Sequence, residues 1–151
     1  MALYKSNVAE YPSLRPAVTA SQAGIVFVSV GAAAVDTDLA AEDLIVLCKL
    51  PAFHQPVDFI LEATELDDAT SIVLSVGILN ADEDDLVADI KFIHESTVAQ
   101  AGGVKRADVL SGLGLAPSNA DRWIAAYVDT VAGTEKAGTV RGKLFYCENP
   151  S

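Results

Sequence analysis

From Gly24 onward the sequence is a series of short apolar stretches in which alternate residues are hydrophobic, and each stretch ends at Pro, Gly, Asp or Asn. An alternation with a period of two is typical of a β-strand that buries one face, and a series of such strands predicts a β-sandwich or a barrel. At 151 residues the chain is long enough to bury a sizeable core without disulfide bonds. We therefore expect an all-β fold in a single domain.

The alternating stretches predict eight or nine strands, the number typical of an antiparallel β-sandwich with jelly-roll or related Greek-key topology. An Ala-rich and then acidic turn is expected after the first strand, and a helical turn near residues 96–100. The glycine-flanked link 133–138 predicts that the last two strands form an antiparallel hairpin. The expected strands cover residues 24–30, 44–50, 57–64, 72–78, 91–94, 104–110, 122–131 and 139–147.

The hydrophobic pattern also predicts which faces are buried. The stretch 44–50 is apolar at nearly every position, so we expect this strand to be almost fully buried. In the stretch 57–64 we expect one inward face, made of every second residue from Val57 to Ala63. We interpret Cys48 and Cys147 as small buried hydrophobic residues; a disulfide between neighbouring strands is the alternative.

Residues 1–22 differ from the sandwich domain that we assign to residues 23–151. Tyr11 and Arg15 each precede a proline, which favours extended backbone, and the apolar residues of this segment follow neither a helical nor a strand period. We expect an extended N-terminal arm that docks on a neighbouring subunit or a larger scaffold through Tyr4, Tyr11, Leu14 and Arg15. A frayed terminus without a role is the alternative.

Trp123 and Tyr127 fall on the face of their expected strand opposite Ile124, Ala126 and Val128. If that face lies outside the sandwich, the two rings form an exposed aromatic patch suited to a subunit interface. If both faces are covered within the domain, the rings are part of the core.

The composition excludes several partners. A net charge of −11 opposes binding to nucleic-acid backbones and to anionic lipid surfaces. The sequence holds no apolar run of about 18 residues and begins without the basic and apolar regions of a signal peptide. We therefore expect no direct nucleic-acid binding and no membrane association, and we expect the protein to stay where it is synthesised.

The sequence contains no recognisable catalytic motif, and we assign no catalytic residue, no cofactor and no metal ligand. A nucleophile elbow, a phosphate-binding loop and a dinucleotide fingerprint are all missing. His54 and His94 are expected to have structural or surface roles. The acidic run from Asp82 to Asp85 is interpreted as a solvated loop, and a calcium site is the alternative. These features favour binding or building over catalysis.

The order of the strand and turn motifs resembles the small β-sandwich proteins of tailed bacteriophages that decorate, or cement, the capsid. The matching segments fall between residues 24 and 147, and they are 49–51, 57–61, 66–69, 72–77, 99–104 and 137–144.

The resemblance implies a non-enzymatic virion protein. Such a protein is made in the host cytoplasm, assembles as a homo-oligomer, here a trimer, and binds the major capsid protein on the outer capsid surface, where it bridges neighbouring capsomers. The alternatives are a phage tail or head-to-tail connector component and a carbohydrate-binding jelly-roll module.

Overall fold

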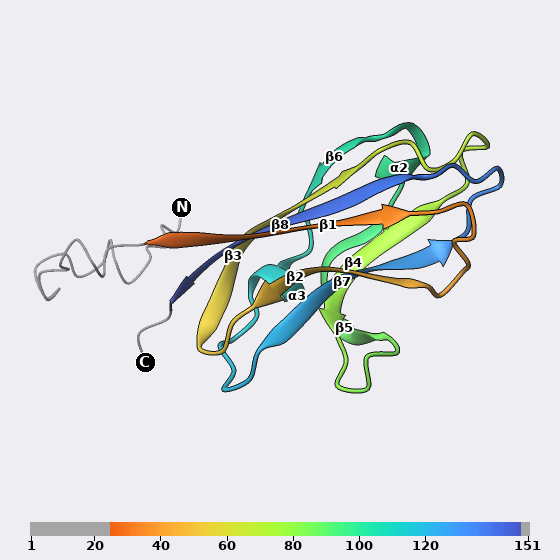
Figure 1. Cartoon of the computed structure of the whole chain (residues 1–151). Coiled ribbons are helices and arrows are strands. Elements are labelled where there is room, and N and C mark those ends of the chain that lie inside the picture. The colour runs from red at the N-terminus through yellow and green to blue at the C-terminus, as the bar shows by residue number, and fades with distance from the viewer. Residues whose placement is uncertain (1–24, 149–151) are drawn as a thin grey trace, which may run out of the picture.

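The computed structural model describes residues 25–148 and places eight strands and two single-turn helices in them (Figure 1). In this part of the chain neither helix has the length or the apolar character to cross a membrane. The elements are β1 (Val26–Val35), β2 (Leu44–Leu50), β3 (His54–Ala63), β4 (Val73–Leu79), β5 (Leu86–Ser96), α2 (Val98–Ala101), β6 (Gly103–Arg106), α3 (Leu110–Leu113), β7 (Arg122–Thr130) and β8 (Gly138–Glu148).

The strands form two four-stranded antiparallel sheets, with the orders β1-β8-β3-β6 and β2-β7-β4-β5. The first strand pairs with the last, the second with the seventh, the third with the sixth and the fourth with the fifth. This nested pairing is what results when one long antiparallel ribbon is wound into a sandwich, which is the jelly roll. The prediction of an all-β antiparallel sandwich is confirmed.

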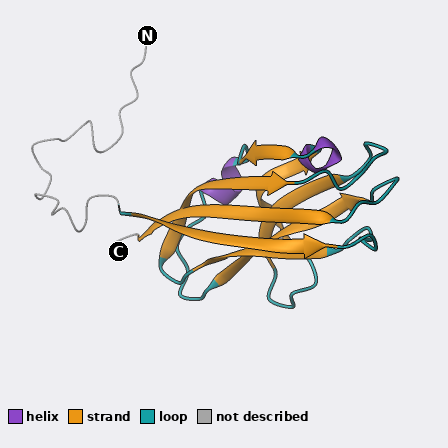
Figure 2. Cartoon of the chain, turned by 45° about the horizontal axis from the view of Figure 1, so that its top comes forward, coloured by secondary structure: helices purple, strands orange, loops and turns teal. Residues whose placement is uncertain are grey.

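Figure 2 brings the β1-β8-β3-β6 sheet toward the viewer, with its long strands side by side. Four loops, β1–β2, β3–β4, β5–β6 and β7–β8, gather at the end of the sandwich away from the two chain termini (Figure 1). We call this end the loop end.

The predicted hairpin between the last two strands is wrong. β7 and β8 lie in different sheets, and the link between them crosses from one sheet to the other. Among the described strands only β4 and β5 are both consecutive and in one sheet. The spacing of turn residues indicates where the backbone reverses, but it does not distinguish a reversal within a sheet from one between sheets.

Several strand boundaries also differ from the prediction. The acidic turn expected at 36–38 is confirmed. The Ala-rich stretch 32–34 before it is part of β1, because pairing with β8 continues through it to Val35. β5 covers eleven residues where four were expected. β6 ends at Arg106, and α3 begins at the last residue of the strand predicted there. The helical turn expected near residues 96–100 is confirmed as α2.

Two β-bulges change the predicted faces. A register shift between Pro56 and Asp58 turns Val57 outward, where its side chain is 47% exposed, while Phe59, Leu61 and Ala63 are buried as predicted. In β2 a second register shift lies between Val46 and Cys48, and the side chains of Val46 and Lys49 are exposed. The prediction that β2 is almost fully buried is therefore wrong. A bulge adds one residue to a strand and so reverses the alternation beyond it.

The core lies between the sheets, where the rings of Phe59 and Phe92 meet at a centroid distance of 5.5 Å. Both cysteine thiols are free; Cys48 is buried, but Cys147 is only half-buried, contrary to its interpretation as a core residue. The largest fully buried side chains are Phe59, Phe92, Leu50, Leu61, Leu66, Ile72, Leu74, Ile93, Ile124 and Leu144.

A pair of glycines allows β2 to approach the opposite sheet. Gly31 of β1 pairs with Gly142 of β8, and both face the bulged Leu47. A Cβ atom at Gly31 would lie 1.6 Å from the carbonyl oxygen of Leu47, and one at Gly142 would lie 2.9 Å from the Leu47 Cβ. The edge of the sandwich therefore closes only if these positions have no side chain.

We expect Gly31→Ala to destabilise the domain, because backbone is displaced to admit the added methyl group. Overpacking of this kind costs about 1–3 kcal/mol. Chemical denaturation followed by circular dichroism measures the loss. Ala32→Ser is the matched control, since Ala32 is exposed on the same strand and should remain within about 0.5 kcal/mol of wild type. Equal stability of the two variants would contradict the close approach at Leu47.

Candidate functional site

Asp67 is the described group whose protonation the fold perturbs most. Its side chain is completely buried in the β3–β4 loop, at the loop end. Titratable groups that are buried and perturbed are candidates for catalysis or ligand binding. The surroundings of Asp67 therefore decide whether the fold holds a chemical site there.

The Asp67 carboxylate accepts hydrogen bonds from four backbone N–H groups. The donors are Ala69 at 2.8 Å, Ser71 at 2.6 Å, Ile72 at 2.8 Å and Thr134 at 3.0 Å. The Ser71 hydroxyl donates a fifth bond at 2.9 Å. Because Thr134 lies in the β7–β8 loop, the carboxylate joins two loops that are more than sixty residues apart in sequence.

These donors determine the pKa of Asp67. Burial of the carboxyl raises its pKa, but the N–H groups of Thr134, Ser71, Ala69 and Ile72 stabilise the charged form and together lower the pKa far below its ordinary value of 3.8. Asp67 is therefore ionised throughout the physiological pH range.

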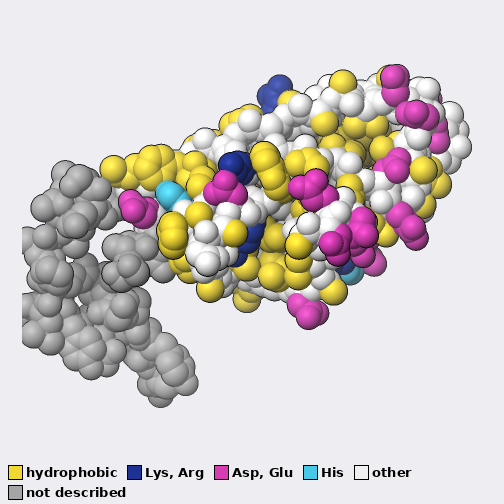
Figure 3. Space-filling view, turned by 60° about the horizontal axis from the view of Figure 1, so that its bottom comes forward, with side chains coloured by type: hydrophobic (Ala, Val, Ile, Leu, Met, Phe, Trp, Pro, Cys, Tyr) yellow, Lys and Arg dark blue, Asp and Glu magenta, His cyan; other side chains and the backbone are white. Residues whose placement is uncertain are grey.

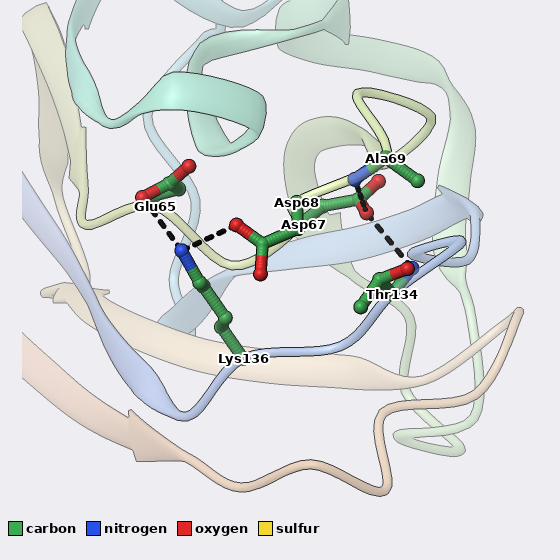
Figure 4. Close-up of polar contacts among 6 residues, drawn as sticks. All are labelled: Glu65, Asp67, Asp68, Ala69, Thr134 and Lys136. Carbon is green, nitrogen blue, oxygen red and sulfur yellow. Dashed lines mark hydrogen bonds and ion pairs between the residues drawn. The ribbon is translucent and has the colours of Figure 1, made fainter.

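An ion pair reinforces the connection at the surface. Lys136 of the β7–β8 loop reaches back to Glu65 at 3.0 Å and Asp68 at 2.5 Å (Figure 4). Hydrogen bonds to Asp68 and Glu65 raise the pKa of Lys136. The three side chains are partly exposed, so we assign them a smaller part in stability than Asp67.

The arrangement around Asp67 is structural. Among residues 25–148 its partners are four backbone N–H groups and the Ser71 hydroxyl, all from the same two loops, and no second acid and no base bonds to it. Nowhere in residues 25–148 do three His, Cys, Asp or Glu side chains converge as metal ligands do. The surfaces of the sandwich remain as candidate sites.

Trp123 and Tyr127 lie on the outer face of the β2-β7-β4-β5 sheet. Trp123 is 42% exposed, and the Lys49 ammonium lies 5.5 Å from its ring centroid. Tyr127 is half-buried and packs with Ala125 against Leu79 and the start of β5. The two rings therefore share a face, but the covered Ala125 lies between them.

Acidic groups surround Tyr127. Burial raises the pKa of its hydroxyl, and the charges of Glu42, Asp85 and Asp129 raise it further. Seen from the side where β2, β7 and β5 lie, the surface carries more acidic than basic side chains (Figure 3). This face is thus polar and negative around Tyr127, and apolar mainly at Trp123 and Val46.

A cavity of about 480 Å³ opens beside Trp123 and is lined by the β4–β5 loop, Leu115 and Arg122. The Arg122 guanidinium donates to the carbonyl oxygens of Ala116 at 2.9 Å and His54 at 3.3 Å, and burial lowers its pKa. Arg122 thereby fixes the loop before β7 against the start of β3.

His54 and His94 have different surroundings. His54 packs edge-on against Tyr146 at a centroid distance of 5.2 Å and contacts the carbonyl oxygen of Ala52, whereas His94 is exposed. In the acidic loop Asp82–Asp85, predicted as a solvated loop, the Asn80 side chain donates to Asp84 and accepts from the Asp84 and Asp85 N–H groups. The predicted arm residues Tyr4, Tyr11, Leu14 and Arg15 lie outside the described residues.

An exposed apolar row on β1 was not predicted from the sequence. Val26, Val28 and Val30 are each about half exposed, at 48%, 49% and 58%. The unbroken apolar run from Ile25 to Val28 was consistent with a strand covered on both faces. The run alone did not indicate that β1 is an edge strand.

Replacing Asp67 by Asn should destabilise the domain, because an amide brings two N–H groups to a site already filled with N–H donors. The wild-type carboxylate stabilises the fold above its ordinary pKa of 3.8 and loses this effect as the pH falls through the lowered folded-state pKa. Thermal unfolding from about pH 7 down to about pH 2 should therefore show a melting-temperature difference that narrows below about pH 4.

Asp68→Asn is the matched control, since it removes an exposed carboxylate one residue away. It should lower the melting temperature less than Asp67→Asn does. A difference between Asp67→Asn and wild type that stays constant with pH would refute the assignment of a charged, buried carboxylate.

Comparison with known proteins identifies relatives of the whole sandwich. No protein-family model matches the chain, and no curated protein matches it. A chain in the capsid of Ralstonia phage GP4 is 30% identical with a TM-score of 0.75, over 92% of this chain and 94% of that one. A chain of the cyanophage Pam1 capsid asymmetric unit is 28% identical with a TM-score of 0.65, over 87% and 98%.

A more distant chain, in the acidic stable capsid of Helicobacter pylori bacteriophage KHP30, is 11% identical with a TM-score of 0.51, over 83% of this chain and 90% of that one. That likeness shows a shared fold. The first two matches extend over nearly the full length of both partners at substantial identity. This chain therefore belongs to the same family as the Ralstonia phage GP4 capsid chain, and it is a capsid-related bacteriophage protein.

Proposed function

We propose that this chain is a capsid decoration protein, a non-enzymatic virion component that binds the outer surface of a phage capsid and bridges neighbouring capsomers. The observation that carries the proposal is the match to a chain of the Ralstonia phage GP4 capsid across 92% of this chain. Because the match covers the sandwich itself, the whole domain and not an appended module is the capsid-related part.

The charge of the chain supports an outer position. With a net charge of −11, the protein would be repelled by packaged nucleic acid on the inside of a capsid. A position on the outer surface avoids that repulsion. The partner there is the major capsid protein, and the protein reaches it after synthesis in the host cytoplasm.

The proposed mechanism is additive. Each interface buries apolar surface worth roughly 25 cal/mol per Å² before the costs of association, and repetition over a lattice makes modest contacts strong. We propose that the protein acts as a homotrimer, with Tyr4, Tyr11, Leu14 and Arg15 of the N-terminal arm in contact with the capsid or a neighbouring subunit. Trp123 supplies a further exposed anchor, with Tyr127 on the same face.

The direct test is co-sedimentation of purified protein with phage capsids that lack it. We expect saturable binding at a stoichiometry fixed by the capsid lattice, and a higher melting temperature for decorated capsids than for bare ones. Bare capsids of an unrelated phage are the control and should bind nothing. Binding to isolated tails but not to heads would instead support a tail or connector component.

Deletion of residues 1–20 should weaken capsid binding by about tenfold or more while leaving the β-rich circular-dichroism spectrum unchanged. The reason is that the deletion removes the large side chains of the arm and none of the described strands. A variant in which a Gly/Ser segment of equal length replaces residues 1–20 separates specific contacts from chain length. If the deletion variant binds like wild type, the arm has no docking role; if only the Gly/Ser variant does, the arm acts through its length and not through its side chains.

A further inference from the structure

The β1-β8-β3-β6 sheet has an outer face whose composition follows from the strand register. Residues paired directly across antiparallel strands point to the same side of a sheet. Val28 pairs with Phe145, Val30 pairs with Lys143, and Ala32 pairs with Arg141. The buried Leu144, between two of these partners, shows that they point away from the core.

An apolar row runs along one edge of this face. Val26, Val28 and Val30 of β1 form it, and Phe145 of β8 adjoins it. We call these four residues the β1 row. Beside the row, β8 and β3 present charged side chains. On this face an apolar area therefore adjoins a charged one, and protein interfaces combine areas of both kinds.

The charges beside the β1 row nearly cancel. Lys143 and Arg141 both pair with Glu62, and Arg106 pairs with Asp58 at 2.7 Å. Three positive and two negative groups therefore lie on this face of a chain whose net charge is −11. By contrast, Glu42, Asp85 and Asp129 raise the negative potential around Tyr127 on the other sheet.

This balance bears directly on contacts between identical copies. Two chains of net charge −11 repel one another, and the repulsion is smallest where the facing surfaces are locally neutral. The surface around the β1 row is such a place, because the cations and carboxylates beside the row can also pair with those of a second copy. An acidic or a basic partner would find no comparable complement there.

The backbone of β1 is also open along its outer edge. Within residues 25–148, β8 is the only strand whose backbone pairs with the backbone of β1. On the side facing β2, the Cys48 thiol donates to the Ser29 carbonyl oxygen at 3.4 Å, and the Lys49 N–H donates to the Ser29 hydroxyl at 3.4 Å. An exposed apolar edge strand of this length is a surface that other chains tend to cover.

We infer that the β1 row is the surface through which copies of this chain contact one another. The occupant of the row is a second copy, so that equivalent rows converge in the homo-oligomer. This inference rests on the homo-oligomeric state in the proposed function and specifies its interface. It assigns the contact between copies to the β1-β8-β3-β6 sheet and leaves the Trp123 face for other contacts.

The test is the molar mass in solution of Val28→Asp and Val30→Asp, measured by multi-angle light scattering over a concentration series. We expect an oligomer for wild type, about 47 kDa for three copies of 15.8 kDa, and monomers for both variants. The matched control is Val104→Asp. Val104 is 66% exposed on β6, at the opposite edge of the same sheet, and its variant should remain oligomeric.

Crosslinking tests the same surface without adding a charge. In a Cys147→Ser background, Val28→Cys should form crosslinked dimers and higher species with a short bismaleimide, whereas Val104→Cys should not. Cys48 is buried and should not react in the folded protein. A folded Val28→Asp protein that keeps the wild-type mass, or equal crosslinking at both positions, would overturn the inference.

The outcome for the wild type separates this inference from the proposed function. A monomeric wild type that still co-sediments with capsids would refute the β1 row as a contact between copies and leave capsid decoration standing. An oligomer dispersed by Val28→Asp, with no binding to capsids, would support the β1 row and refute decoration.

Discussion

The jelly roll depends on loops that carry the backbone from one sheet to the other, and the buried carboxylate of Asp67 holds two of these loops together. Backbone N–H groups in a crossing loop lie beyond the reach of either sheet and require other partners once they are buried. The Asp67 carboxylate is that partner for the backbone N–H groups of Ala69, Ser71, Ile72 and Thr134. The Leu66 N–H also donates to the Ala99 carbonyl oxygen, which ties the β5–β6 connection to the same group of loops. One ionised side chain thus organises the end of the sandwich where most crossings occur.

Much of the fold could be predicted from the sequence because alternation reflects burial directly. The fold class, the approximate strand positions and the inward face formed by Phe59 and Leu61 follow from that pattern. Strand partners could not be predicted, because periodicity has no information on which sheet a strand joins. The bulges at Leu47 and Val57 were also missed, since each depends on how one strand crosses another.

The candidate surfaces were less predictable than the fold. Placing Trp123 and Tyr127 on one face required only alternation, but the cover over Ala125 comes from β4 and β5, which are distant in sequence. The exposure of Val28 depends on the edge position of β1, which is a property of the whole sheet. Asp67 was not singled out because its partners are main-chain groups, which have no signature in the side-chain sequence.

The pairing of the first strand with the last determines how the domain carries mechanical load. Val26 lies opposite Cys147, so both ends of the described chain leave the sandwich side by side. A force that separates the two ends opens the β1–β8 pair one residue at a time, whereas a force between these ends and the loop end acts on all ten residue pairs at once. The domain is therefore strong along its length and weak to peeling at its termini, so it resists tension best when its two ends are held together on one support.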